Sequence, residues 1–459
     1  MTIHRLLPNA KQVIRTRDFD MLPVVLKDST PNDLAELMTD LPISDQLIVL
    51  RHLPRSRAVS TFQYLLPITQ QRLLKAMPPE QAATILNEMS PDDRTFLLEE
   101  SSATTSKEIL DLLAPEKRAV AVSLLEYPEG SVGRLMTPDY IALRENWSVQ
   151  QVLDYIRQHG QDSETLNVVY VIDEKGILLD DIRIREFLLT PLNRRVSDLM
   201  DRQFVALQTT DDEKAAVAVF KREDRTVLPV VDSVGKLVGI VTIDDILDVA
   251  EQAVTEDFQK IGGLEALDEP YMHISLVRMV RKRAGWLVLL FLGEMLTATA
   301  MGFFEKEIAR AVVLALFIPL IISSGGNSGS QASSLVIRAL ALGEVRLRDW
   351  WRVFRREILS GLLLGTILGA IGFSRVAIWS AFSDIYGPHW LLVAFTVGCA
   401  LIGIVLWGTL AGSTLPFILR GVGFDPATSS APFVATLVDV TGLVIYFTIA
   451  SLILRGTLL

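Results

Sequence analysis

Five long apolar stretches in the C-terminal part of the chain constrain its fold more than any other feature. They lie at about residues 285–304, 311–340, 358–382, 389–419 and 431–454. A helix of about 20 apolar residues spans the roughly 30 Å hydrocarbon core of a bilayer. Stretches such as LLLGTILGAIGF are apolar on every side, whereas the helices of a soluble core keep a polar face. The sequence therefore predicts five membrane-spanning helices, and the second and fourth are long enough to tilt or to contain a break.

Charge divides the chain near residue 270. Residues 1–270 contain 29 Lys and Arg against 45 Asp and Glu, whereas residues 271–459 contain 15 against 9. An acidic, soluble part therefore precedes an apolar, slightly basic part. So acidic a head disfavours nucleic acid as a partner. The single cysteine, Cys399, excludes an intrachain disulfide, and the N-terminus lacks the long apolar core of a cleaved signal peptide.

Basic residues near the ends of the stretches predict the orientation. One side carries many of them: Arg278, Arg281, Lys282, Arg283, Arg346, Arg348, Arg352, Arg355, Arg356 and Arg420. The other side carries fewer: Lys306, Arg310, Arg375 and Arg455. This bias predicts that the acidic head is cytoplasmic and, with five spans, that the C-terminus lies outside an inner or plasma membrane.

An aspartate, Asp439, interrupts the last apolar stretch, APFVATLVDVTGLVIYF (residues 431–447). A carboxylate at the bilayer centre costs roughly 3 kcal/mol on insertion scales and is a functional candidate by default. Ala435, Thr436 and Gly442 share its helix face, because they lie three or four residues away. Small residues there let an ion or water reach backbone carbonyls. A structural hydrogen bond to another helix is the alternative.

Two other polar features lie in the spans. IISSGGNSGSQASS (residues 321–334) offers neutral oxygens from Asn327 and Gln331. It is compatible with irregular backbone beside water, with a tight helix-packing seam, or with both. No Lys follows its glycines, which excludes a phosphate-binding P-loop. Glu294, in the first span, faces either the bundle interior or a membrane interface.

Oxygen ligands without a His or thiolate cluster favour a hard cation such as magnesium or calcium. The one histidine of the spans, His389, lies at a membrane edge. Magnesium keeps several waters and often binds through one or two carboxylates. A two-fold axis that brings two Asp439 side chains together would suit a hydrated magnesium ion, which would offset the burial of the carboxylates.

Prolines punctuate residues 30–130 with a regular period. Pro42, Pro67, Pro91 and Pro115 are 25, 24 and 24 residues apart, and each begins or precedes a short Leu-rich stretch. Proline suits the first turn of a helix, and short helices at a fixed period stack as an α-solenoid. The sequence predicts a helical-repeat domain without a catalytic constellation.

Residues 134–250 contain a duplication. Leu135-Met136 recurs as Leu199-Met200, and each unit predicts strand, helix, strand, turn, strand, helix. GKLVGIVTIDDIL (residues 235–247) resembles a CBS domain. That resemblance implies that Thr242 and Asp245 contact the ribose and phosphates of an adenosine nucleotide such as ATP. The first copy, GILLDDIRIREFL, has lost the pattern, and a pair used only for dimerisation or metal sensing is the alternative.

An acidic helix is predicted to lead from this pair to the membrane. DDILDVAEQAVTED (residues 244–257) has six carboxylates in fourteen positions, and through Gly262 the helix would be about 25 Å long. Such acidity is typical of a solvated face. If this helix faced another acidic domain, the two would repel each other unless divalent cations screened their charges.

The order of these parts resembles the MgtE-type magnesium transporters across nearly the whole chain. The resemblance rests also on TEDFQKIGGLEALDEPY (255–271), GGNSGSQASSLVIRALALGE (325–344) and PFVATLVDVTGLVIYF (432–447). It implies a homodimeric, magnesium-selective channel with its pore on the two-fold axis, closed by intracellular magnesium. The domains would be a helical-repeat N domain (1–131), paired CBS domains (132–250), a connecting plug helix (251–277) and a five-helix transmembrane domain (278–459).

The resemblance also implies roles for particular residues. In the pore these are Asp439, the carbonyl of Ala435 and the amide of Asn327; Ala431 supplies no polar group where some relatives have one. The regulatory carboxylates would be Asp92, Asp93, Asp224, Asp245, Asp248, Glu256 and Asp257. The expected partners are Mg²⁺, a second copy of the chain and membrane lipid, and no enzymatic activity is expected.

Two other functions fit the same residues. A proton- or sodium-coupled divalent-metal exchanger would use Asp439 and Glu294 as carriers. A membrane sensor that does not transport would bind a nucleotide at the CBS pair. Flux that needs a counter-ion would favour the first, and tight nucleotide binding without flux the second.

Overall fold

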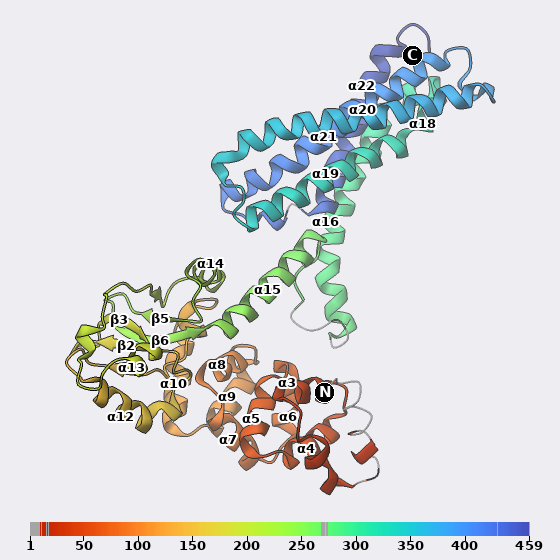
Figure 1. Cartoon of the computed structure of the whole chain (residues 1–459). Coiled ribbons are helices and arrows are strands. Elements are labelled where there is room, and N and C mark those ends of the chain that lie inside the picture. The colour runs from red at the N-terminus through yellow and green to blue at the C-terminus, as the bar shows by residue number, and fades with distance from the viewer. Residues whose placement is uncertain are drawn as a thin grey trace. The chain divides into compact units, whose positions relative to one another are not determined.

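The chain forms two compact units, Met1–Gln252 and Ala253–Leu459. A computed structural model describes residues 10, 12–14, 16, 18–267, 271, 274–428 and 430–458. Figure 1 shows the elements of each unit.

Short helices fill the first part of the N-terminal unit. The described part of this region begins with η1 (Phe19–Met21) and α2 (Leu22–Val25). Eight helices follow: α3 (Pro31–Thr39), α4 (Ile43–His52), α5 (Arg55–Gln63), α6 (Pro67–Ala76), α7 (Pro79–Glu88), α8 (Pro91–Glu99), α9 (Ala103–Leu112) and α10 (Pro115–Leu125). Helices here contact the next but one along the chain: α3 contacts α5, and α5 contacts α7. The predicted solenoid is confirmed.

A buried polar side chain recurs every 24 residues in this solenoid. Gln46 donates hydrogen bonds to the carbonyls of Met38 and Leu41, at 2.7 and 2.9 Å. Gln70, on α6, bonds the Phe62 carbonyl at 2.8 Å, and Arg94, on α8, bonds the Leu86 carbonyl at 2.9 Å. Each donor bonds a carbonyl near the end of an earlier helix, where carbonyls lack the usual partner four residues on. The period of the sequence is therefore also a period of helix capping.

The CBS pair forms two similar three-stranded sheets. The first contains β1 (Ala142–Leu143), β2 (Val168–Ile172) and β3 (Leu178–Arg183), and the second β4 (Leu207–Gln208), β5 (Val227–Val231) and β6 (Leu237–Thr242). In each, the first strand pairs parallel and the third antiparallel to the middle strand. The helices are α11 (Val132–Leu135), α12 (Val149–His159), α13 (Ile184–Leu189) and α14 (Glu213–Glu223). Tyr170, Val227 and Ile240 share one core, so the two sheets pack together.

In the described part of the chain, five helical segments are long and apolar enough to cross a membrane. They contain α16 (Leu276–Phe303), α18 (Val312–Ala315) with α19 (Ile318–Ala341), η4 (Leu347–Asp349) with α20 (Trp350–Ser380), α21 (Trp390–Val422) and α22 (Ala431–Leu454); α17 (Glu305–Arg310) and η5 (Asp384–Tyr386) are connections. The predicted number is confirmed. The first and third segments begin earlier than residues 285 and 358, because the helices continue into the basic residues that flank them.

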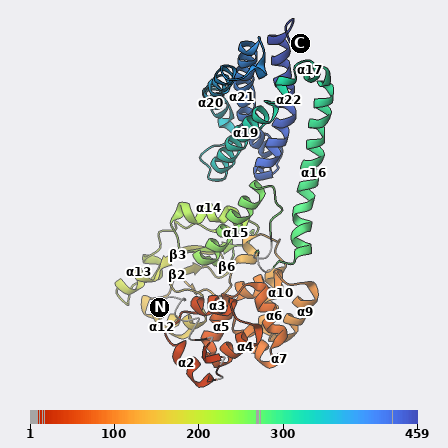
Figure 2. The ribbon, with the colours of Figure 1, turned by 90° about the vertical axis from the view of Figure 1, so that its right-hand side faces the viewer.

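Glycines bring α19 and α21 into close contact. A Cβ on Gly412 would lie 2.0 Å from the carbonyl oxygen of Gly329, and one on Gly408 would lie 2.3 Å from that of Gly325. The stretch IISSGGNSGSQASS is regular helix within α19. Of the two interpretations of that stretch, the packing seam is right, and its backbone is not irregular. Figure 2 shows α16 beside α22, which it contacts.

Candidate ion sites

Asp439 lies where α22 meets α19. A Cβ on Gly326 would lie 3.5 Å from Asp439 Oδ1 and 3.4 Å from the Cβ of Ala435. These are ordinary van der Waals distances, so the half-buried carboxylate lies directly against α19 at Gly326. The structure places Asp439 and Ala435 on one surface, as a shared ion site requires.

Neutral polar groups flank this contact on α19. Asn327 follows Gly326 and is exposed, and its Nδ2 donates to Ser323 Oγ at 3.4 Å. Ser330, one turn further on, donates to the carbonyl of Ala431 at 3.0 Å. Amide, hydroxyl and carbonyl oxygens are therefore available near the aspartate, which is the ligand chemistry that a hydrated hard cation takes.

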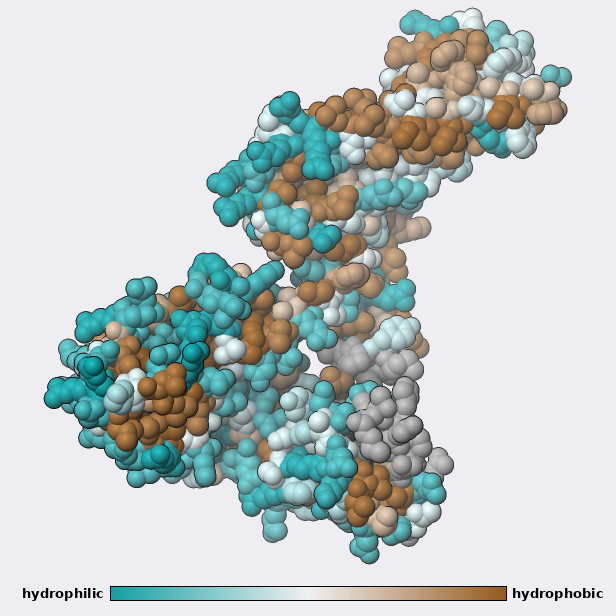
Figure 3. All heavy atoms as spheres, viewed as in Figure 1, coloured by the Kyte–Doolittle hydropathy of each residue, from teal (hydrophilic) through white to brown (hydrophobic). Residues whose placement is uncertain are grey.

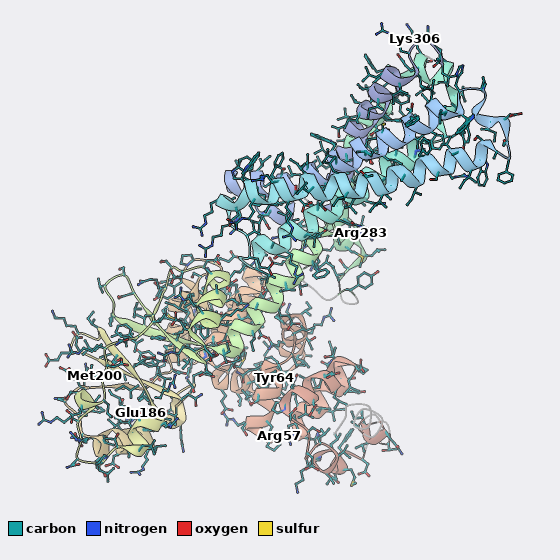
Figure 4. The ribbon with its side chains drawn as sticks, turned by 45° about the horizontal axis from the view of Figure 1, so that its top comes forward. Arg57, Tyr64, Glu186, Met200, Arg283 and Lys306 are labelled. Atoms are coloured by element: carbon teal, nitrogen blue, oxygen red, sulfur yellow. The ribbon has the colours of Figure 1, made fainter. Side chains whose placement is uncertain are left out.

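Glu294 lies beside the same region. A Cβ on Gly293 would lie 2.8 Å from Thr436 Cγ2, so α16 crosses α22 one turn before Asp439. The charge of Glu294 acts on Asp439. The sequence left the surroundings of Glu294 open, and the structure places it near the aspartate. Figure 4 shows Arg283 near one end of α16 and Lys306 beyond its other end.

A second group of carboxylates lies in the N-terminal unit. Asp92 and Asp93 occupy the first turn of α8, and Asp244 and Asp245 begin α15 (Ile243–Ile261), with Asp248 one turn later. Carboxylates suit the first turn of a helix, where the dipole is positive. The charges of Asp92, Asp93 and Asp244 all act on Asp245. We call the five residues the acidic cluster.

The acidic cluster gathers like charges where water is partly excluded. Burial, together with the charge of Asp93, raises the pKa of Asp92 to about 6. Burial and the charge of Asp92 raise the pKa of Asp245 well above its ordinary value. Partial burial raises the pKa of Glu164 to about 7, although the residue keeps contact with solvent, and the cluster's charges add to that effect.

Glu164 and Asp139 are two functional candidates that sequence reasoning missed. Asp92 and Asp139 act on Glu164, and the Glu164 amide donates to the Asp139 carbonyl at 2.8 Å. Both residues lie in loops of the first CBS copy, far from the cluster in sequence. No periodicity or motif marks them, so only the packing of the N domain on this copy identifies them.

Neutral side chains hold part of the cluster. Ser90 Oγ donates to Asp93 Oδ2 at 2.7 Å, and the Gln63 amide donates to the same oxygen. Within the described ranges, no three His, Cys, Asp or Glu side chains lie close enough to hold one metal ion directly.

The remaining predicted regulatory residues lie elsewhere. Asp224 is exposed at the end of α14, and it is not among the charges that act on Asp245 or Asp248. Glu256 and Asp257 lie on the part of α15 that belongs to the other unit. There Lys260 Nζ lies 3.8 Å from Glu256 and 2.9 Å from Asp425. The roles of these residues stay predictions.

Thr242 and Asp245, the predicted nucleotide contacts, bond each other beside the acidic cluster. Thr242 Oγ1 donates to Asp245 Oδ2 at 2.7 Å, and that carboxylate faces the charges of Asp92, Asp93 and Asp244. A phosphate beside them would be repelled. In the first copy Asp180 stands where the second has Gly239, and its carboxylate accepts from the amide of Arg202 at 3.0 Å. Nucleotide binding at Thr242 and Asp245 stays a prediction.

Raising the pH in the absence of Mg²⁺ is expected to destabilise the full-length protein in detergent. The folded pKa of Asp92 is raised, so its neutral form stabilises the fold below pH ~4, and this contribution is lost as pH rises through about 6. Asp92 alone accounts for about 3 kcal/mol. Thermal unfolding at pH 4 and pH 8 measures the loss.

Asp92→Asn should remove part of that pH dependence, whereas Asp40→Asn, at an exposed position of the same domain, should keep it. Mg²⁺ should restore stability at pH 8. Identical pH profiles for the wild-type protein and Asp92→Asn would contradict this prediction.

Three family models match the chain. One, described as a divalent cation transporter, matches residues 318–449; another, described as the MgtE intracellular N domain, matches residues 29–130. A CBS-domain model matches residues 132–189 and 196–251. Together these matches cover the solenoid, both sheets and most of the membrane-spanning helices.

Known proteins of similar sequence are magnesium transporters. The magnesium transporter MgtE of Thermus thermophilus is 38% identical over 455 residues, which cover 98% of this chain and 99% of that protein. The magnesium transporter MgtE of Enterococcus faecalis is 31% identical over 333 residues, which cover 72% of this chain and 71% of that protein. A crystal structure of the cytosolic domain of the Mg²⁺ channel MgtE in complex with ATP is 35% identical, with a TM-score of 0.51, and covers 53% of this chain and 99% of that one.

Proposed function

Because the chain belongs to the MgtE family of magnesium transporters, we propose that it is a Mg²⁺-selective channel closed by intracellular Mg²⁺. The working form is a homodimer in an inner or plasma membrane, with the N-terminal domains in the cytoplasm and the C-terminus outside. Asp439, the Ala435 carbonyl and Asn327 line the pore.

The observation that carries the gating proposal is the acidic cluster. Its carboxylates come from the N domain and from the start of α15, and they repel one another across that contact. Hydrated Mg²⁺ between them relieves the repulsion and holds the N domain against α15. When Mg²⁺ is scarce the repulsion is unscreened, and the contact loosens.

Helix α15 connects the cluster to the membrane part. It runs without a break from Ile243 to Ile261, so it carries Asp245 and Asp248 near one end and Lys260 near the other. Lys260 donates to Asp425 at 2.9 Å, and Asp425 lies just before η6 (Pro426–Thr428), in the connection between α21 and α22. Movement of α15 can therefore reach the helix that contains Asp439.

Magnesium flux into proteoliposomes tests the gating proposal. Wild-type flux should fall as internal Mg²⁺ rises, whereas Asp245→Asn/Asp248→Asn should keep conducting at high internal Mg²⁺. The matched control Asp28→Asn/Asp40→Asn removes the same charge from exposed positions of the N domain and should close normally. Normal closure of the cluster variant would contradict the proposal.

A coupled exchanger is the second candidate, because Glu294 lies close enough to act on Asp439. Two carboxylates could exchange a proton or a sodium ion for magnesium. Dissipating the proton and sodium gradients separately decides between the two candidates. Flux that continues without either gradient supports the channel, and flux that stops supports the exchanger.

An adenosine nucleotide takes no part in the proposed gating. The relative's cytosolic domain was crystallised with ATP. Here the position of Asp245 faces a cluster of negative charge and the first CBS copy has Asp180 and Arg183 in place of its pattern. Closure by Mg²⁺ alone is therefore the expected behaviour.

A further inference from the structure

An unusual density of arginines surrounds the start of α20. Arg346, Arg348, Arg352, Arg355 and Arg356 are all exposed. None of the five makes an ion pair with the described residues. Because two spans separate them from the start of α16, they lie on the same side of the membrane as that start. The charge of Arg356 acts on the neighbouring Glu357, but no ion pair fixes any of the five to a described carboxylate.

One of these charges is unfavourable for the helix itself. Arg352 lies in the first turn of α20, where the dipole favours anions and disfavours cations, and Arg355 and Arg356 follow in the second turn. An anion bound there would satisfy both the helix terminus and the guanidinium groups. Arginine presents a planar fork of donors that matches phosphate in a bidentate geometry.

The arginines continue into an exposed aliphatic stripe. Gly361, Gly365 and Gly369 face α21, because a Cβ on any of them would approach that helix to 3.1 Å or less. The outward face follows a spacing of three or four residues, from Arg352 and Arg356 to Leu359, Leu363 and Ile367. The three aliphatic side chains are 64%, 68% and 57% exposed.

The stripe is about as long as the hydrocarbon layer of one membrane leaflet is thick. Eleven residues separate Arg356 from Ile367, which at 1.5 Å per residue is ~16 Å. Half of a bilayer's hydrocarbon core is about 15 Å. Figure 3 shows hydrophilic residues at the end of the bundle where α20 begins, and an apolar surface further along it.

Aromatic rings hold the start of α20 at the level expected for lipid headgroups. Trp351 stacks on Phe354 with ring centroids 5.4 Å apart, and Trp350 is 5.4 Å from Trp351. Trp350 and Phe354 line a small hollow together with Phe417 of α21. Tryptophan is enriched at membrane–water interfaces, so we expect the arginines to lie beside the phosphates of one leaflet.

We propose that the start of α20 is a binding site for anionic phospholipid. Arg352, Arg355 and Arg356 hold the phosphate, and one acyl chain lies along Leu359, Leu363 and Ile367. The aliphatic stripe distinguishes a lipid from a soluble phosphate, which would leave it uncovered. A second copy of the chain would oppose arginine with arginine, which disfavours it as the occupant.

Native mass spectrometry of the full chain, released from nanodiscs of phosphatidylglycerol and phosphatidylcholine, tests the site. The wild-type protein should retain phosphatidylglycerol. Arg352→Gln/Arg355→Gln/Arg356→Gln should weaken retention roughly 100-fold, and each single variant roughly 5-fold, since each basic residue contributes similarly. Lys306→Gln/Arg310→Gln, at the opposite ends of the spans, should retain lipid like the wild type.

Single variants keep the test valid if the triple variant does not fold. Inorganic phosphate at high concentration should not displace the lipid. Equal retention by the wild-type and arginine variants overturns the proposal. Displacement by inorganic phosphate would assign the site to a soluble anion, and loss of a second copy in the triple variant would assign it to a protein interface; either result overturns the proposal as well.

Discussion

Replacement of Asp439 by asparagine is expected to reduce magnesium flux by roughly two orders of magnitude or more. The aspartate is the carboxylate of α22, and it lies against α19 at Gly326. A cation in the membrane offsets the cost of burying the carboxylate, and the carboxylate in turn compensates the cation's lost hydration. Losing about 3 kcal/mol of that interaction corresponds to roughly 100-fold in binding. Flux into proteoliposomes measures the effect.

The matched control is Asp384→Asn, which removes a carboxylate from η5, a connection between spans. Its flux should equal that of the wild-type protein. Asp439→Asn must also be purified with unchanged thermal stability, so that lost flux reports the pore and not the fold. Wild-type flux in a folded Asp439→Asn protein would rule out Asp439 as the ion site and would leave Glu294 as the main candidate.

Replacement of Gly412 by alanine is expected to cause a large loss of stability for a single added methyl group. Its Cβ would lie 2.0 Å from the Gly329 carbonyl oxygen, which belongs to helix backbone and cannot move alone. The two helices would have to separate, which breaks other contacts of the seam. Overpacking of this kind costs about 1–3 kcal/mol and sometimes more. Thermal unfolding of the detergent-purified protein measures the loss.

Gly421→Ala is the control, because Gly421 lies on the same helix and a Cβ there meets nothing within 4 Å. It should be neutral or slightly stabilising, since alanine favours helix. If Gly412→Ala and Gly421→Ala unfold at the same temperature, the close approach of α19 and α21 is not a main source of stability.

The two expected effects also separate packing from conduction. Gly408 and Gly412 contact α19 from α21, on the face that carries Gly325 and Gly329. Asp439 contacts α19 at Gly326, which is one residue further round the helix. A Gly412 variant should therefore lose stability before it loses ion selectivity, whereas an Asp439 variant should do the reverse.

Patterns local in sequence determined the architecture. Five apolar stretches predicted five spans, because the thickness of the bilayer sets their length. The proline period predicted the solenoid, and the internal repeat predicted the order of strands and helices along each CBS copy. Apolar stretches, proline spacing and an internal repeat are patterns along the chain, so they can be recognised without a structure.

The tertiary structure alone decided which charges meet. Glu164 and Asp139 act with the acidic cluster although no pattern marks them, and Asp224 is not among the charges acting on Asp245. Likewise only the crossing of α16 and α22 brought Glu294 near Asp439. Electrostatic interaction and burial depend on distance in space, and that distance is set by how helices remote in sequence pack. The sequence by itself therefore determined the elements and the candidate carboxylates, whereas only the fold decided which of them share a site.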